Sequence, residues 1–388
     1  MTTLRKIIFW SHLGCGLIAG VVIVIMSATG VAIAFEHEIL GWIDRDVARV
    51  TAQANATPKS LAELRTALAT QHPDFKPTTV LVPRDPTVAY TWRSGPTTIL
   101  YGNPYTGIAT APPSDPAHGF LHTLEEWHRW LGQKNGPTST GRLVTGVCNL
   151  AFLGLCMTGL WLWFPRKWSK RALRPLLWFV GSYRGKARDF NWHNVLGLWS
   201  APVLIVLVAT AAVISFGWGH NLVFRLAGEK PPQFRDFRMM AVTAPAVPPP
   251  PTTDTPRLSA DALLAAAIRA FPQWESVGLN FPAKPDPAKP ADVVVFEPAP
   301  FATAGRIQVY LDPYRGEVLQ KISFADRSPG LRARVWARFI HTGEAFGLTG
   351  KIIATLATAA SLVLVYTGFA LSWRRFFGRR GKAAVSAT

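Results

Sequence analysis

The fold is decided by two stretches, His12-Leu-Gly-Cys-Gly-Leu-Ile-Ala-Gly20 and His193-Asn-Val-Leu-Gly-Leu-Trp-Ser-Ala201. Each stands at the start of one copy of a repeated apolar segment. Residues 12–35 align with residues 193–216 without a gap, at an offset of 181 (193 − 12). An ionisable residue at membrane depth is costly and usually has a functional partner. We therefore expect His12 and His193 to face each other as the axial ligands of one haem.

Four uncharged runs indicate a membrane protein. They cover residues 13–35, 143–164, 194–219 and 352–373, and each has at least 22 residues. At about 1.5 Å per residue, a helix of this length crosses roughly 30 Å of hydrocarbon. The sequence thus predicts a membrane α-helical protein with a four-helix transmembrane bundle.

The net charge of +18 is distributed unevenly along the 388 residues. Arg5 and Lys6 precede the first run, residues 166–188 hold eight basic residues and no acid, and five basic residues follow Trp373. The positive-inside rule therefore predicts a multi-pass protein of the bacterial inner membrane with both termini and the 166–188 loop in the cytoplasm. Because topology accounts for the charge, we expect membrane lipid and no nucleic acid as a partner.

The segments between the apolar runs repeat as well, each with a helix, three strands and a turn of the form Asn/Asp-Pro-Tyr-x-Gly. In this turn the short polar side chain begins the bend, proline fixes φ, and glycine accepts a positive φ. The helices are expected over 59–70 and 259–271, and the strands near 80–82, 89–92, 97–101, 277–281, 292–296 and 307–311.

The second and fourth runs match at an offset of 209, which pairs Gly141 with Gly350 and the dipeptide Thr158-Gly159 with Thr367-Gly368. An amphipathic segment bearing a histidine precedes each of these runs. The chain therefore reads as an internal duplication, in which a span with histidine, an α+β segment, a second histidine and a second span occur twice. Its halves are expected to be related by a pseudo-twofold axis along the membrane normal.

The chain resembles the PepSY-associated transmembrane family over nearly its whole length. The resemblance lies in the order of spans and α+β segments, in the Asn/Asp-Pro-Tyr-x-Gly turns and in the two Thr-Gly dipeptides. Within it, the chain is most similar to the inner-membrane ferric-siderophore reductases of the FoxB type, which are di-haem proteins. The resemblance implies two periplasmic PepSY-like modules. The expected parts are span one (1–36), module one (37–116), a juxtamembrane helix with span two (117–165), a basic cytoplasmic loop (166–190), span three (191–219), a linker with module two (220–328), and a juxtamembrane helix with span four and a cytoplasmic tail (329–388).

A haem held by two histidines needs neutral imidazoles on opposite sides of the porphyrin and a gap between the helices. Gly16 and Gly197 follow His12 and His193 by four residues, one helical turn away on the same face, and leave room for the ring. The alternative is that the histidines reach the interface and that Gly16 and Gly20 form a helix-packing face.

A second haem pair is expected on the outer side. His128 and His341 precede the matched Gly-Arg and Gly-Lys by 13 and 9 residues. His122, His118 and His37 are the competing ligands.

Basic residues near the second pair could contact haem propionates, foremost Arg129 and Arg142, with Arg338 and Lys351 as further candidates. Outer aromatic residues such as Trp127 and Trp130 could wall a substrate site, or could form an ordinary interfacial belt.

Two haems b stacked along the membrane normal would carry electrons outward. The sequence has no nucleotide-binding loop, so the donor is expected to be a quinol or a cytoplasmic reductase. The resemblance implies a ferric-siderophore reductase, with a hydroxamate-type siderophore guessed as substrate. No catalytic side chain is assigned beyond the haem ligands. The alternatives are a cytochrome b subunit that serves another protein acceptor, and a non-redox regulatory PepSY-type membrane protein.

Overall fold

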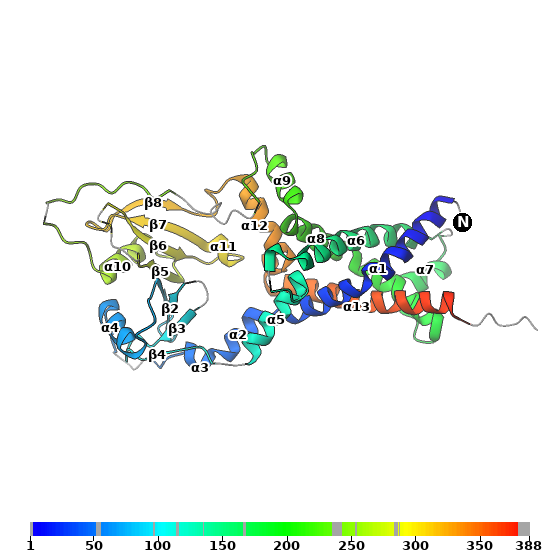
Figure 1. The fold of residues 1–388 in the computed structure, drawn as a ribbon, viewed down its shortest axis with the longest axis horizontal. Coiled ribbons are helices and arrows are strands. Elements are labelled where there is room, and N and C mark those ends of the chain that lie inside the picture. Colours follow the sequence, from blue (N-terminus) through cyan, green and yellow to red (C-terminus); the bar gives the residue numbers. More distant parts are fainter. Residues whose placement is uncertain are drawn as a thin grey trace, which may run out of the picture. The chain divides into compact units, whose positions relative to one another are not determined.

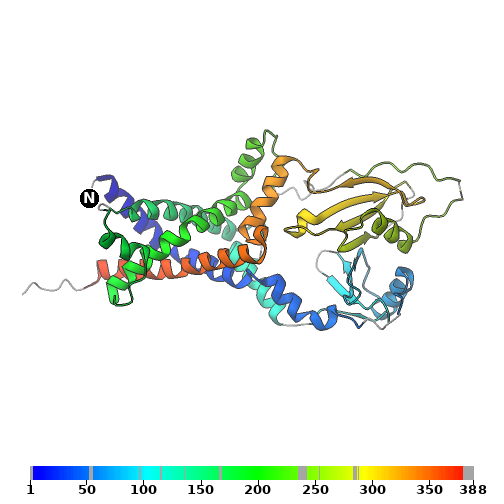
Figure 2. The same cartoon turned by 180° about the vertical axis from the view of Figure 1, so that it is seen from behind.

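The computed structural model describes residues 3–51, 56–95, 98–113, 116–134, 136–165, 168–234, 243–252, 254–282, 286 and 288–378. The chain forms two compact units. The membrane unit consists of Met1–Glu36, Gly119–Val223 and Trp336–Thr388, and the sheet unit of His37–His118 and Phe224–Val335. Figure 1 and, from behind, Figure 2 show that the first contains the long helices and the second contains the sheet.

Four long helices form the membrane unit: α1 (Thr3–Ile33), α6 (Thr140–Trp163), α8 (Gly185–Ser215) and α13 (Gly347–Phe376). Each is long and apolar enough to cross a membrane. Helices α1 and α8 each pack against both α6 and α13, so the four close into a bundle. Large apolar side chains such as Ile18, Leu143 and Leu356 are exposed on its outside, as expected of a surface that meets lipid. The predicted multi-pass membrane architecture is thus observed.

Both units also contain short helices. They are α2 (Glu36–Ile43), α3 (Arg45–Ala48), α5 (Pro116–Trp130), α7 (Lys170–Leu177), α9 (Gly217–Leu226) and α12 (Pro329–His341). The third long helix differs from the prediction: it begins at Gly185, inside the stretch expected to be loop, and ends at Ser215. Arg188 and Asp189 are therefore helical. Asp189 is fully buried and pairs with two arginines, Arg188 and Arg374.

The sheet unit contains one eight-stranded antiparallel sheet with the order β4-β3-β2-β1-β5-β6-β7-β8. Its strands are β1 (Thr79–Pro83), β2 (Tyr90–Ser94), β3 (Thr98–Gly102), β4 (Ala109–Thr110), β5 (Ser276–Asn280), β6 (Ala291–Phe296), β7 (Arg306–Leu311) and β8 (Val318–Ile322). Helices α4 (Leu61–Gln71) and α10 (Ala260–Ala270) bury their leucines and alanines on one face, against alternate strand residues. The short helix α11 (Ala302–Gly305) precedes β7.

The two predicted α+β segments share this sheet, which the sequence had not indicated. Strands β1 and β5 pair antiparallel, with Thr79 opposite Asn280 and Pro83 opposite Ser276. Every residue of β1 has a partner in β5, and the alternate residues of both strands face the same core. The six predicted strands are all present, and β4 and β8 extend the sheet at its two edges.

Both predicted turns form by the same hydrogen bonds. The Asn103 side chain accepts from the backbone N–H groups of Tyr105 and Thr106, and Asp312 accepts from Tyr314 and Arg315. The glycines that end the two turns have φ of 82° and 72°, which a residue with a Cβ rarely adopts.

Candidate functional site

The four predicted histidines form two facing pairs in the membrane unit. His12 on α1 and His193 on α8 have ring centroids 6.4 Å apart and ring planes at 84°. His128 on α5 and His341 on α12 have ring centroids 6.3 Å apart and ring planes at 42°. Each pair joins residues from different halves of the chain. The partners are 181 residues apart in the first pair (193 − 12) and 213 residues apart in the second (341 − 128).

The separation within each pair suits one metal ion held from both sides. A metal–imidazole bond is about 2 Å long and the ring centre lies about 1 Å beyond the nitrogen, so two imidazoles on one metal have centres about 6 Å apart. In the described part of the chain, no cluster of three or more histidine, cysteine or acidic side chains could hold a metal ion. Two imidazoles alone therefore fit a metal that brings its own equatorial ligands, as haem iron does.

Hydrogen bonds set the tautomer of the first pair. The Nδ1 atom of His12 lies 2.9 Å from Oγ1 of Thr158, and Nδ1 of His193 lies 2.9 Å from Oγ1 of Thr367. Each threonine hydroxyl donates its hydrogen to a backbone carbonyl of its own helix at 2.7 Å. The threonine oxygens must then accept from Nδ1–H, so Nε2 carries the lone pair in both rings, as a metal ligand requires.

The glycine after each threonine gives the imidazole its space. A Cβ added at Gly159 would lie 3.4 Å from Cε1 of His12, and one at Gly368 would lie 3.7 Å from Cε1 of His193. The repeated Thr-Gly dipeptide thus does two things: threonine orients the ring and glycine admits it.

Backbone carbonyls set the tautomer of the second pair. The Nδ1 atom of His128 lies 2.8 Å from the carbonyl oxygen of Met26 on α1, and Nδ1 of His341 lies 2.9 Å from that of Leu207 on α8. A carbonyl only accepts, so both Nδ1 atoms carry a hydrogen and both Nε2 atoms are left as ligands. Met26 and Leu207 are separated by the same 181 residues (207 − 26) as His12 and His193.

The surroundings of the second pair favour neutral imidazoles. Burial lowers the pKa of His128 to about 4, with a smaller contribution from the facing His341. Burial also lowers the pKa of His341, partly offset by its hydrogen bond to Leu207, and the Arg129 charge lowers it further. The neutral form is the one that binds metal.

One glycine at the second pair was not singled out in the sequence. A Cβ at Gly30 on α1 would lie 3.0 Å from Cε1 and 3.3 Å from Nδ1 of His128. Gly132, which follows His128 by four residues, instead lies beyond the end of α5 with φ of 71°, against the Trp127 ring. At the first pair, a Cβ on Gly16 or Gly197 would meet only a leucine, Leu155 or Leu364, at 3.7 Å.

The basic candidates differ in their surroundings. Arg129 pairs with Glu125 at 2.7 Å, and its charge acts on both histidines of the second pair. Arg142 donates to the carbonyls of Ile214 and Ser215, the last residues of α8. The observed Arg142 contacts therefore place it at a helix end, where it compensates unsatisfied carbonyls.

The competing histidines lie apart from the two pairs. His37 and His122 are exposed. The Nε2 atom of His118 lies 3.2 Å from a carboxylate oxygen of Asp44, within the sheet unit.

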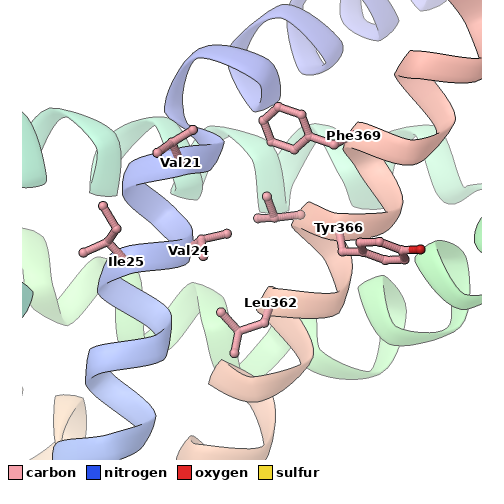
Figure 3. A pocket seen from close by; sticks show the side chains of 7 residues that line it. Val21, Val24, Ile25, Leu362, Tyr366 and Phe369 are labelled. Carbon is pink, nitrogen blue, oxygen red and sulfur yellow. The ribbon is translucent and has the colours of Figure 1, made fainter.

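The two pairs occupy different levels of the bundle. Along α1, 14 residues (26 − 12) separate His12 from Met26, the contact of His128, and this spans roughly 21 Å at 1.5 Å per residue. Between these levels, α1 and α13 enclose an open groove of about 380 Å³. Figure 3 shows this groove, whose lining is Val21, Val24, Ile25, Leu362, Val365, Tyr366 and Phe369.

Comparison with known proteins identifies the family of the chain. No curated protein matches the chain. The model of a family described as the PepSY-associated TM region matches residues 9–375, which include all four paired histidines and all four long helices except their outermost residues. The chain therefore belongs to the PepSY-associated transmembrane family.

Proposed function

We propose that this protein is a di-haem b-type transmembrane reductase that passes electrons to a ferric siderophore on the periplasmic side of the bacterial inner membrane. The observation that carries the proposal is the pairing of four histidines at 6.4 and 6.3 Å, each with Nδ1 bound and Nε2 left for a metal. Bound haem supplies reversible one-electron exchange at iron.

The protein's own residues hold and orient the group. His12 and His193 would ligate one haem, and His128 and His341 the other, while Thr158 and Thr367 keep the first two rings in place. Such partners of the ligands raise ligand basicity and fix ring orientation. Buried apolar residues such as Ile23 and Leu204 lie between the two levels of the bundle.

The proposed orientation has the termini in the cytoplasm and the sheet unit in the periplasm. Its support is the charge of the sequence, because the stretch of residues 166–188 has eight basic residues and no acid. The His12/His193 pair then lies toward the cytoplasm, since α1 begins there, and the His128/His341 pair toward the periplasm.

The substrate class comes from the resemblance to the ferric-siderophore reductases, and the proposed periplasmic position of the second pair would give such a substrate access to it. A ferric siderophore with hydroxamate-type oxygen donors binds Fe(III) as a hard ion, and its hold weakens when the iron is reduced to Fe(II). We also propose that the two halves arose by duplication, because the contacts of both histidine pairs recur at offsets of 181 and 209 residues (367 − 158).

Two other functions compete with this one. A cytochrome b subunit would have the same histidine pairs but pass its electrons to a protein acceptor. A non-redox regulator would use the sheet unit to bind a peptide or peptidase and would need no haem.

The absorbance spectrum of the purified full-length protein is the decisive experiment. We expect a Soret band and a reducible α-band, with two haems per chain by pyridine haemochrome assay. Reoxidation of the reduced protein by a ferric hydroxamate then separates the reductase from the cytochrome subunit. Protein that lacks haem after expression with ample haem supply would contradict the proposal.

A further inference from the structure

We infer that Asp44, Tyr101 and His118 form a binding site for a ferric ion. All three residues belong to the sheet unit, so the site lies within one compact part of the chain. The inference goes beyond the proposed function, because it needs no haem: the protein's own oxygen and nitrogen atoms would hold the iron.

The three side chains meet at the carboxylate of Asp44. The Tyr101 hydroxyl donates to Oδ2 of Asp44 at 3.0 Å, and Nε2 of His118 lies 3.2 Å from Oδ1. Bonds from a first-row metal to nitrogen or oxygen are about 2.0–2.2 Å long, so two donor atoms at right angles on one ion are about 3 Å apart. Both observed separations therefore suit neighbouring ligands of a single ion.

Three elements bring these side chains together. Asp44 stands between α2 and α3, Tyr101 lies on β3, and His118 lies in the first turn of α5. On β3, Leu100 faces the hydrophobic core that α4 and α10 cover, so Tyr101 next to it projects from the opposite face of the sheet. Its hydroxyl is thus available to Asp44 outside that core.

Half of the Asp44 carboxylate is buried without a hydrogen bond. Asp44 is only 5% exposed, and no hydrogen bond from any residue that the structure describes reaches its Oδ1. Nε2 of His118 is near this oxygen but makes no hydrogen bond with it, and Nδ1 of the same ring is buried without a described partner. An unsatisfied buried carboxylate oxygen is costly. A cation bound to a lone pair of Oδ1 and one of Nε2 would remove this cost.

Helix capping does not explain Asp44. An aspartate before a helix usually has an extended backbone and accepts a hydrogen bond from an N–H group of the first turn. Asp44 precedes α3 with φ of −79° and ψ of −5°, and its side chain makes no capping bond. The carboxylate is turned toward Tyr101 and His118 instead.

The second half of the chain lacks this set of donors. At the offsets that match the neighbouring segments, the corresponding residues are Tyr310 for Tyr101 (offset 209), Arg225 for Asp44 (offset 181) and Leu331 for His118 (offset 213, that of the second histidine pair). The tyrosine is kept, but arginine and leucine offer no lone pair to a metal. The second half still forms its strand and its turn. The architecture of such a segment therefore does not require the aspartate and the histidine.

The three donors together favour a hard, highly charged ion. A carboxylate and a phenolate are hard oxygen donors, and imidazole is a ligand that iron accepts. The Tyr101 oxygen ligates once its proton has left, and a trivalent ion drives this loss more strongly than a divalent ion does because its charge is larger. The proton passes to water beside His118, whose side chain is 31% exposed. Because one donor is a tyrosine, the site contains only two residues of the histidine, cysteine and acidic types.

The site leaves part of the ion open to other ligands. An octahedral ion takes about six donor atoms, and the three side chains supply at most four, counting both carboxylate oxygens. The remaining positions would accept water or the oxygen atoms of a chelator from the exposed side of His118. On the proposed function, a ferric siderophore would then be held by its iron at α5, the helix that also carries His128.

The first experiment measures binding to the full-length protein, with ferric nitrilotriacetate as the probe. After desalting, we expect one iron per chain in excess of the haem iron, by mass spectrometry of the metal and pyridine haemochrome assay. A rhombic high-spin ferric signal should appear in electron paramagnetic resonance, unlike the low-spin signals of haem with two imidazoles. Resonance Raman spectra should contain the vibrations of an iron-bound tyrosinate. Absence of both signatures from protein saturated with the probe would overturn the inference.

The second experiment locates the site with matched variants. Asp44→Asn should weaken ferric binding more than about 100-fold, since loss of a mere hydrogen-bond partner of a ligand already costs 10–100-fold. Tyr101→Phe should abolish the tyrosinate vibrations. The controls are Asp46→Asn, at an exposed carboxylate on α3, and Tyr310→Phe, at the matching position of the second half. Both controls should bind iron as the parent does. Unchanged binding in Asp44→Asn, or equal loss in a control, would overturn the assignment.

Folding and metal preference are tested on the same proteins. Iron should raise the melting temperature of the parent but not of His118→Gln, because only a ligand that binds the folded state stabilises it. This variant also serves the binding test if Asp44→Asn does not fold. Displacement of the iron by an equal free concentration of Zn(II) would overturn the ferric assignment. Protein that binds iron here but contains no haem would contradict the proposed function alone, and the site would stand.

Discussion

His128 and Met26 are joined by a hydrogen bond of 2.8 Å from the imidazole Nδ1 to the backbone carbonyl, and this bond ties the juxtamembrane helix α5 to the first span. The corresponding bond from His341 to Leu207 ties α12 to the third span. The second pair therefore depends on both spans as much as on its own helices.

Removal of either histidine of the second pair should have one shared effect. On the proposed function we expect His128→Ala and His341→Ala each to lose one of two haems, because each substitution removes one of the two imidazoles that would hold it. Pyridine haemochrome assay of the purified variants gives the stoichiometry. His122→Ala, on the exposed side of α5, is the matched control and should keep both haems. Full haem content in the His128 variant would show that the second pair is misassigned.

The threonines should tune the first pair without ligating it. Thr158→Val and Thr367→Val keep the side-chain volume but remove the oxygen that accepts from Nδ1–H. We expect haem affinity to fall about 10–100-fold, the usual effect of losing such a partner, as measured by haem transfer to apomyoglobin. Thr158→Ser and Thr367→Ser should restore most of the affinity. If the valine variants bind haem as tightly as the parent, the hydrogen bonds do not orient the ligands.

Gly30 allows a steric test of the second pair, and Gly14 on the same helix provides the control. A Cβ at position 30 would come within 3.0 Å of the His128 ring, whereas one at Gly14 would meet no atom within 4 Å. Gly→Ala inside a helix otherwise stabilises by about 1 kcal/mol. We therefore expect Gly30→Ala to lose the second haem and Gly14→Ala to keep both, read from the haem stoichiometry. Two haems in Gly30→Ala would mean that the ring moves freely aside.

The two pairs should differ in their electron paramagnetic resonance spectra. The His12 and His193 rings are nearly perpendicular, at 84°, and the other two are tilted by 42°. Perpendicular axial imidazoles donate equally to two iron orbitals, which leaves these orbitals close in energy and makes the low-spin signal strongly anisotropic. We expect two ferric signals, the more anisotropic one absent from His12→Ala and His193→Ala. A single ferric signal whose intensity falls by half in every histidine variant would contradict the expected difference between the two pairs.

The proposed orientation can be tested with reporters. Alkaline phosphatase needs oxidative folding, so a fusion near Pro250 should be active and a fusion after Thr388 silent. A cytoplasmic reporter such as green fluorescent protein at the same two positions should give the opposite pattern. The reverse pattern of reporter activity would mean that the protein has the opposite orientation and that electrons flow toward the cytoplasm.

Repetition identified the first histidine pair in the sequence, whereas the second pair does not match at either offset and followed only from its place before the second and fourth spans. The offsets of 181 and 209 residues singled out His12, His193 and the Thr-Gly dipeptides, and the structure brings these residues together. Gly30 was not found because its position in the other half holds Ala211, so no repeat pointed to it. Its role depends on a ring that arrives from α5, roughly 100 residues later in the chain.

The junction of β1 with β5 could not be read from the sequence for a different reason. Alternation of apolar residues in each strand shows which face is buried, but it does not name the neighbouring strand. The start of α8 at Gly185 also differs from the sequence prediction, because a charged stretch without acidic residues is typical of a loop. Asp189 with its two arginines makes that charge compatible with a buried helix end.

The pairing of β1 with β5 has a consequence for the ancestry and assembly of the chain. Thr79 faces Asn280, Pro83 faces Ser276, and Leu81 faces Gly278 at the centre, so the register is identical when it is read from either strand. This is the geometry of an isologous contact, in which one surface meets a copy of itself. On the proposed duplication, a half-length ancestor would have paired as a homodimer with one continuous sheet and both haem sites shared between its subunits. Fusion of two such copies would then have freed each half to diverge.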